Sequence, residues 1–208
     1  MKKIKVLNGY AGIGGNRKLW PDKEIEVIAV ENNPEISRAY KDFFPNDKVI
    51  VTDAHKYLLE HYKEFDFIWL SRPCQSHTIM RKNVSVQRGQ SKPIYPDMGL
   101  YQEIIFLQHY FKGKYAVENV KRMYYNPLIK PQISGNHYFW TNFNITKLKS
   151  VIRNVELGNN KVYKKQTGFN LDGYKLGKRK DTVYHNCVDS KLGLHIFNCA
   201  FKTKQLTL

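Results

Sequence analysis

Short apolar runs alternate with helix-like segments through the first 120 residues, and this alternation limits the possible folds more than any other feature. Runs rich in β-branched and aromatic residues predict strands over 3–8, 25–31, 49–52, 65–70 and 115–117. Between them, the sequence predicts a short helix ending at Trp20 and longer helices over 34–44, 54–63 and 97–111. The run 65–70 is almost wholly apolar, as is typical of a parallel strand covered on both faces. Together these elements predict an α/β fold with a doubly wound sheet.

Composition excludes several classes of protein. The 208 residues suffice for one domain with a full core and at most a small appendage. A hydrophobic fraction of 42% is too high for a disordered chain. No apolar run approaches the length of a membrane span, and the N-terminal residues become polar before a secretory signal could form, so we expect a cytoplasmic protein. The three cysteines form no paired pattern and are expected to be reduced.

Positive charge is in large excess. Lysine and arginine total 34 against 18 acidic residues, a formal net charge of +16. Such an excess favours a polyanionic partner such as nucleic acid, although a lysine-rich proteome would produce the same composition. Two basic stretches interrupt the strand–helix rhythm: 71–96, which is long enough to be a functional lid, and 147–180, which we expect to form short strands and turns.

A glycine-rich turn follows the first predicted strand. Residues 10–15 are Tyr-Ala-Gly-Ile-Gly-Gly, and glycines there let the backbone approach a ligand closely. Glu31 and Asp53 stand at the ends of the second and third predicted strands. Because the carboxyl ends of parallel strands meet at one edge of the sheet, the turn and the two carboxylates predict a nucleotide-binding site. A glycine turn by itself would indicate only a turn.

The fourth and fifth predicted strands are followed by residues that can perform catalysis. Cys74 lies just after a strand, at the start of the basic stretch, where nearby positive charge can favour the thiolate. Cys187 and Cys199 are expected to be buried structural residues. Glu118 ends a buried strand, so it either caps a helix or forms a salt bridge, or it faces the same cleft as Cys74.

Three motifs in this order resemble those of the DNA cytosine-5 methyltransferases: Tyr-Ala-Gly-Ile-Gly-Gly, Pro-Cys-Gln and Glu-Asn-Val. The resemblance covers residues 4–145 and resumes near Asn186-Cys187-Val188, before a predicted C-terminal helix. It implies a Rossmann-like class I methyltransferase sheet and S-adenosylmethionine as cofactor. The residues it assigns to the cofactor are Tyr10, Ala11, Gly12, Ile13, Gly14, Gly15, Glu31, Asn32, Asp53, Ala54, Leu100, Asn186 and Val188. The residues it assigns to catalysis are Pro73, Cys74, Glu118, Asn119 and His137.

The resemblance also implies the reaction. Cys74 would attack C6 of a cytosine in double-stranded DNA, Glu118 would stabilise the charge developing on the ring, and C5 would take the methyl group. The base must leave the helix for this chemistry, and the basic stretch after Cys74 would close over it. No membrane partner and no metal are expected, a monomer is favoured, and the small size suits a phage or bacterial enzyme of the restriction-modification kind.

The chain departs from the family pattern at two places. Relatives usually carry an Arg-x-Arg pair where this chain has Gly135-Asn136-His137, so that His137 stands in the place of the second arginine. Histidine carries a full charge only when it is protonated, so the rate of the enzyme would fall as pH rises if His137 replaces the arginine. Alternatively, Lys121 or Arg122 supplies the missing positive charge, or the enzyme is weak. His137 can also be an ordinary strand residue. Residues 1–146, completed by 181–208, would form the catalytic domain, and 147–180 would be a very small target-recognition insertion.

Three alternatives remain open on the sequence alone. The same scaffold could methylate RNA, such as a transfer RNA, or it could be a catalytically weak DNA-binding relative. A zinc site could use two residues at i,i+2 spacing on a strand and two at i,i+4 spacing on a helix: His185, Cys187, His195 and Cys199. Zinc is disfavoured because this spacing matches no metal signature and the last motif already accounts for 186–188.

Overall fold

One mixed sheet organises the part of the chain that the computed structural model describes, which is residues 2–148, 160–176 and 180–201. The strand order is β3-β2-β1-β4-β5-β7-β6, and the first five strands in this order are parallel. Strand β7 lies antiparallel to both β5 and β6. The bounds of the strands are β1 Ile4–Gly9, β2 Ile25–Glu31, β3 Lys48–Val51, β4 Phe67–Leu70, β5 Lys114–Val120, β6 Gln132–Ser134 and β7 His137–Thr141. The predicted α/β sheet is confirmed.

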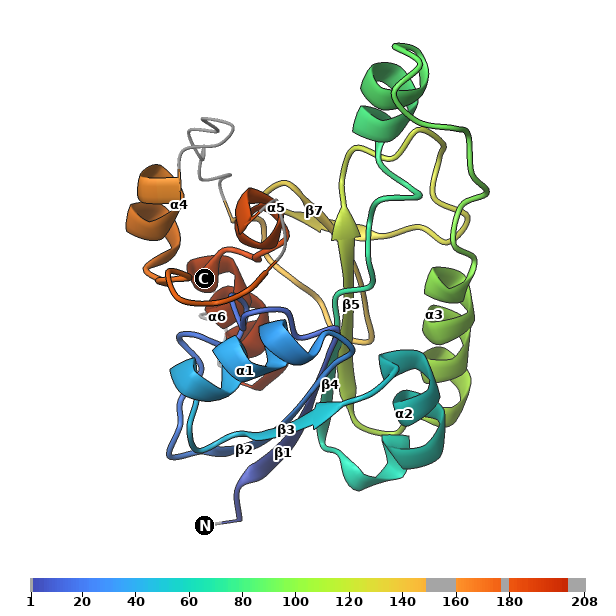
Figure 1. Cartoon of the computed structure of the whole chain (residues 1–208). Coiled ribbons are helices and arrows are strands. Elements are labelled where there is room, and N and C mark those ends of the chain that lie inside the picture. Colours follow the sequence, from blue (N-terminus) through green and yellow to red (C-terminus); the bar gives the residue numbers. More distant parts are fainter. Residues whose placement is uncertain (1, 149–159, 177–179, 202–208) are drawn as a thin grey trace.

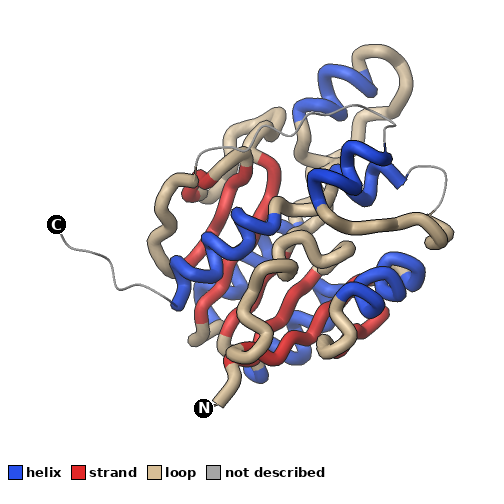
Figure 2. Tube along the Cα trace, turned by 90° about the vertical axis from the view of Figure 1, so that its left-hand side faces the viewer, coloured by secondary structure: helices blue, strands red, loops and turns tan. Residues whose placement is uncertain are grey.

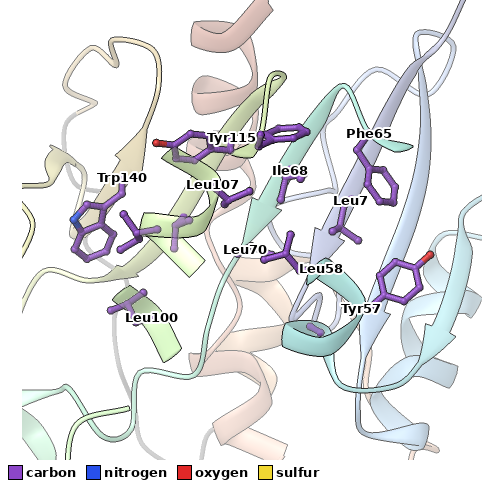
Figure 3. Close-up of a cluster of buried hydrophobic side chains, with 14 of the residues drawn as sticks. Leu7, Tyr57, Leu58, Phe65, Ile68, Leu70, Leu100, Leu107, Tyr115 and Trp140 are labelled. Carbon is purple, nitrogen blue, oxygen red and sulfur yellow. The ribbon is translucent and has the colours of Figure 1, made fainter. Parts of the chain in front are cut away.

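Helices cover both faces of the sheet (Figure 1; Figure 2). On one face, Leu7, Ile68 and Leu70 pack with residues of α2 and α3 in a single buried cluster (Figure 3). On the other face, Phe67 and Trp69 pack with residues of α6. The alternating side chains of β4 therefore enter two different cores, which explains why this strand is apolar at every position. The helices are α1 Pro34–Phe43, α2 Ala54–His61, α3 Gly99–Tyr110, α4 Asn160–Thr167, α5 Lys180–His185 and α6 Ser190–Phe201.

Side-chain caps fix where the first two helices begin. The Asn33 side chain accepts hydrogen bonds from the backbone N–H groups of Glu35 and Ile36, and Pro34 occupies the first helical position. Asp53 caps α2 by accepting from the N–H of Lys56 at 2.8 Å. Because both caps follow strands directly, they hold the connecting turns at the carboxyl edge of the sheet.

Four local predictions were wrong. The residues up to Trp20 form successive turns closed by i to i−3 hydrogen bonds, and the buried Arg17 pairs there with Asp47 at 2.9 Å. Part of the 71–96 stretch is a π-helix, Arg81–Val86. Residues 160–167 form α4, not strands and turns, because Tyr163 is buried in a cluster with Phe169 and Tyr184. Residues 180–185 form α5, so the segment that contains His185 is not a strand.

The described helices include none that is both long enough and apolar enough to span a membrane.

Candidate active site

A cavity of about 380 Å³ opens at the carboxyl ends of β1, β2, β4 and β5. The predicted cofactor residues that line it are Tyr10, Ala11, Gly12, Ile13, Gly15, Glu31, Asn32, Asp53, Ala54, Asn186 and Val188. The predicted catalytic residues that line it are Pro73, Cys74, Glu118, Asn119 and His137. Gly14 and Leu100 are not among its lining residues, and Leu100 lies fully buried in the core cluster that also contains residues of α2 and β4.

The glycine turn forms one wall of the cavity. Gly12 has a φ of 55°, and a Cβ atom added there would meet nothing within 4 Å, so the turn leaves open space at this position. Gly14, by contrast, has a φ of 81°, and a Cβ there would come within 2.3 Å of the Phe44 ring. The first glycine thus leaves room for a ligand, whereas Gly14 permits close packing on α1.

Glu31 presents a fixed carboxylate on the same side. Its Oε2 accepts from the N–H of Gly12 at 3.1 Å, and its Oε1 accepts from the N–H of Asn33 at 3.0 Å. Each carboxylate oxygen has capacity for a further hydrogen bond, which suits the hydroxyl groups of a ribose. The open Gly12 and the held carboxylate therefore fit an adenosine-containing cofactor.

The segment before α6 closes the cavity from the other side. A Cβ atom on Gly15 would lie 2.3 Å from both Cys187 Sγ and Val188 O, so only glycine allows this segment to pack on the turn. Cys187 is buried, as predicted. Residues 187 and 188, which come long after β5 in the chain, thus lie on the cofactor side of the cavity.

Glu118 and His137 form a close pair on the catalytic side. Glu118 Oε1 lies 2.6 Å from His137 Nδ1, and the Glu118 side chain is only 8% exposed. In the antiparallel register of β5 and β7, His137 stands opposite Val120, two residues along from Glu118. Residues in this diagonal relation lie on the same face of a sheet and within reach of long side chains.

The nucleophile turn is anchored to the end of β5. The Asn119 side chain donates to the carbonyl oxygen of Arg72 at 3.1 Å. The carbonyl oxygen of Cys74 accepts from the N–H groups of His77 and Thr78. Cys74 therefore sits at the start of a hydrogen-bonded turn beside Glu118.

The charge environment of Cys74 differs from the one predicted. Burial and the nearby charge of Glu118 raise the pKa of the Cys74 thiol to about 11. The lysines and arginines of the following stretch do not offset these two effects, so the resting form is the thiol and not the thiolate. Any reaction in which this sulfur attacks a substrate must therefore include a step that removes the thiol proton.

Glu118→Gln should speed the alkylation of Cys74 by iodoacetamide several-fold at pH 10, where the thiol loses its proton to solvent, because removing the carboxylate charge lowers the pKa of the thiol. Mass spectrometry of the Cys74 peptide over time measures this rate. Glu60→Gln, an exposed change on α2, serves as the matched control and should leave it unaltered. An unchanged rate in Glu118→Gln would show that burial alone governs the thiol.

A charged cluster next to the nucleophile was missed by the sequence-based prediction. Arg72 Nε donates to Asp97 Oδ2 at 2.7 Å and Arg72 Nη1 donates to Glu103 Oε1 at 2.5 Å. Tyr10 and His55 also contact Glu103, whose side chain is fully buried. A signal was present, because Glu103 falls on the apolar face of a helix whose other buried positions include Leu100, Ile104 and Leu107.

Arg72 and Asp97 also close the base of the basic stretch. Asp97 follows that stretch, and its N–H donates to Ser76 Oγ at 3.0 Å. A Cβ atom on Gly99 would lie 2.2 Å from Arg72 Nη2. Glycine at the first position of α3 therefore leaves room for the Arg72 guanidinium. The ion pair between Arg72 and Asp97 thus joins the two ends of the basic stretch 71–96.

Exposed cations occur on two segments of the chain. Figure 1 shows the π-helix and α4 at the end of the molecule toward which β5 runs. Lys82 is exposed on the π-helix, Arg88 and Lys92 on the residues that follow it, and Lys161 and Lys165 on α4. Such cations can contact phosphates.

The four residues of the zinc alternative are not brought together. His185 Nε2 lies 2.7 Å from the Tyr163 hydroxyl, whereas His195 lies beside Thr146 and Cys199. In residues 2–148, 160–176 and 180–201, no group of three or more His, Cys, Asp or Glu side chains could hold a metal ion.

The strand order and the cavity at the carboxyl ends of the parallel strands are those of a Rossmann-like α/β fold. A sequence profile of the C-5 cytosine-specific DNA methylases matches residues 4–128, and the chain belongs to this family. The family and the cofactor S-adenosylmethionine, both expected from the three motifs, are thereby confirmed.

Comparison with solved structures gives more distant likenesses. They include the PH0226 protein from Pyrococcus horikoshii OT3, with 22% identity, 58% of this chain and 50% of that chain covered, and a TM-score of 0.40. A mutant of DNMT2 from Spodoptera frugiperda shows 24% identity, with 57% and 36% covered and a TM-score of 0.39. The plantazolicin methyltransferase BamL, solved with SAH, shows 14% identity, with 58% and 40% covered and a TM-score of 0.38. The chain thus spans half the length of the first of these proteins. A search of curated proteins finds no match.

Proposed function

We propose that the protein transfers a methyl group from S-adenosylmethionine to C5 of a cytosine flipped out of double-stranded DNA. One observation carries this proposal: Cys74 and Glu118 line the same cavity as the glycine turn and Glu31. A thiol, a carboxyl group and a ribose-binding carboxylate around one space are what a covalent route to C5 methylation requires.

The cofactor would lie along the wall made by the glycine turn. Glu31 would accept hydrogen bonds from the ribose hydroxyls, and Asp53 and Ala54 would border the adenine. Asn186 and Val188, which the packing on Gly15 brings to the cavity, would cover it from the opposite side. When bound, the cofactor supplies an electrophilic methyl group.

Cys74 would act as the nucleophile. Its sulfur forms a bond to C6, and the π electrons of the C5–C6 bond move through the ring toward N3. Glu118 would hold a proton at N3 and so stabilise the displaced charge. After C5 is methylated, loss of its proton and of the sulfur restores the aromatic base. Pro73 and Asn119 would fix the turn on which the sulfur is carried.

The charge supports a nucleic acid as substrate, and the family match favours duplex DNA. A formal net charge of +16 and exposed cations on the π-helix and α4 favour a long polyanion. A base must be turned out of the helix to reach Cys74, and the basic stretch held by the Arg72–Asp97 pair would close over it. The sequence offers Lys178 and Arg179 as further phosphate contacts and Arg153 as a candidate for reading base edges; these three lie outside the described residues.

Incubation with methyl-labelled cofactor and either duplex DNA or bulk RNA tests the proposal. Label should enter the DNA, bisulfite sequencing should locate it at cytosines, and DNA containing 5-fluorocytosine should trap a covalent complex. Label found only in RNA would overturn the DNA assignment. DNA binding without transfer or trapping would instead support a non-catalytic role.

A further inference from the structure

The pairing of Glu118 with His137 brings together two titratable side chains beside the partly buried thiol of Cys74. Their Oε1 and Nδ1 atoms are 2.6 Å apart, and the two side chains are 8% and 24% exposed. A carboxyl group and an imidazole at this distance can share one proton, which resides on either partner at little cost. The pair is therefore able both to accept a proton and to give one up.

The other titratable groups around the cavity have different partners. Glu31 and Asp53 accept backbone N–H groups, Asp97 and Tyr10 contact Arg72, and His185 contacts Tyr163. Arg72 is the single lysine or arginine among the described lining residues, and its guanidinium is held by Asp97 and Glu103. Lys121 and Arg122, just after β5, are exposed and do not line the cavity. Among the described lining residues, Glu118 and His137 are thus left as the natural partners of the Cys74 thiol.

We propose that the Glu118–His137 pair accepts the proton of the Cys74 thiol and returns that proton to N3 of the cytosine. This inference rests on the proposed function. The S–H bond breaks as the pair takes the proton, and the S–C6 bond forms with the electron pair left on sulfur. The displaced ring electrons reach N3, which takes the proton from Glu118. When sulfur leaves C6 after the loss of the C5 proton to solvent, N3 returns its proton to Glu118, and the pair passes that proton to the thiolate, so the cycle closes.

Electrostatics supports this route. Because burial and Glu118 raise the pKa of Cys74 to about 11, almost no thiolate exists at neutral pH unless a neighbouring base accepts the proton. When the thiol proton passes directly to the pair, it neutralises the negative charge of Glu118, which is the charge that disfavours the thiolate. The same step loads Glu118 with the proton that N3 needs.

The dependence of rate on pH follows from counting protons. Below the range in which histidines release their proton, the pair already carries one, and the positive charge of the imidazole makes Glu118 a weaker acceptor for a second proton, so the rate falls toward acid pH. Above that range, one proton is shared among Cys74, Glu118 and His137, and the rate is level. It falls again only near pH 11, where the thiol proton is lost to solvent. This is the reverse of a simple charge role for His137, in which the rate falls as pH rises through neutrality.

The test is the pH profile of kcat/KM for methyl transfer in the full chain between about pH 5.5 and 9. The wild type should rise through the neutral range and then level off. His137→Arg keeps a donor beside Glu118 but cannot release its proton, so this inflection should disappear and the rate at pH 8 should fall at least about tenfold. His109→Gln, an exposed change on α3, should keep the inflection. An inflection that persists in His137→Arg, or a wild-type rate that falls through neutrality, would overturn the proposal.

A second measurement separates this inference from the proposed function. The proton held between Glu118 Oε1 and His137 Nδ1 can be observed by NMR without any substrate. Because a carboxylate at 2.6 Å is a charge-assisted acceptor, this proton should resonate far downfield in the wild type, and its signal should move upfield in Glu118→Gln, whose neutral amide is a weaker acceptor. Absence of such a signal, or a signal unchanged in Glu118→Gln, would refute the proton-sharing pair even if methyl transfer is observed. A downfield signal that moves in this variant, in a chain that methylates nothing, would support the pair and remove only its proposed reaction.

Discussion

Replacing Cys74 with serine should lower the rate of methyl transfer by about 10⁴-fold or more while leaving cofactor binding intact. Loss of a covalent nucleophile costs on the order of 10⁶ in well-studied enzymes, and a serine hydroxyl ionises even less readily than this buried thiol. The cofactor wall is built by other elements, the glycine turn, Glu31 and the segment before α6, none of which depends on the sulfur. Transfer of labelled methyl to duplex DNA measures the rate, and calorimetry measures cofactor affinity.

Covalent trapping of a substrate analogue gives the control for this prediction. Wild-type protein should form a covalent complex with 5-fluorocytosine DNA that resists denaturation, and Cys74→Ser should not. Cys199→Ser, which alters a cysteine of α6 that does not line the cavity, should behave as wild type. Full transfer activity in Cys74→Ser would mean that another group attacks the base.

The sheet and the location of the site could be predicted because they depend on local patterns. Each parallel strand is an apolar run followed by glycine or a polar residue, and the carboxyl ends of such strands meet at one edge. Tyr10, Glu31, Cys74 and Glu118 are far apart in the chain, yet this rule places them around one cavity. Helix α1 was equally predictable, since Asn33 and Pro34 are a local start signal.

Features that depend on tertiary contacts could not be predicted in the same way. The turns before Trp20 replace a helix because left-handed Gly14 and the buried Arg17–Asp47 pair hold the chain there. Helix α4 forms in a polar, lysine-rich segment because Tyr163 is buried against distant residues. The bond between Glu118 and His137 depends on β7 pairing with β5 in one register, which the separate motifs do not specify.

The raised pKa of Cys74 illustrates the same limit for electrostatics. The number of nearby cations in the sequence suggested a favoured thiolate. In the folded chain those cations lie outside the cavity or, as with Arg72, are held by acidic partners, whereas Glu118 is close enough to disfavour the charge. Distance and burial, not sequence proximity, decide which charge dominates.

Arg72→Met should destabilise the folded chain by about 3 kcal/mol, the lower end of the range for breaking a buried ion pair. The Glu103 side chain is fully buried and would lose the guanidinium that compensates its charge, while Tyr10 and His55 remain as weaker partners. For a chain of this size such a loss corresponds to a fall in Tm of roughly 6–12 °C. Thermal unfolding followed by circular dichroism measures it, and Arg38→Met on exposed α1 should leave Tm unaltered.

A second substitution distinguishes an unpaired charge from lost packing as the cause. Glu103→Leu in the Arg72→Met background removes the uncompensated carboxylate and should recover most of the lost stability, since replacing both members of a buried pair by apolar residues is often close to neutral. The double variant should nevertheless transfer methyl groups more slowly than the wild type, because Asp97 would no longer be paired with Arg72 at the start of the nucleophile turn. If the double variant is less stable than Arg72→Met, the destabilisation arises from packing around α3 and not from the buried charge of Glu103.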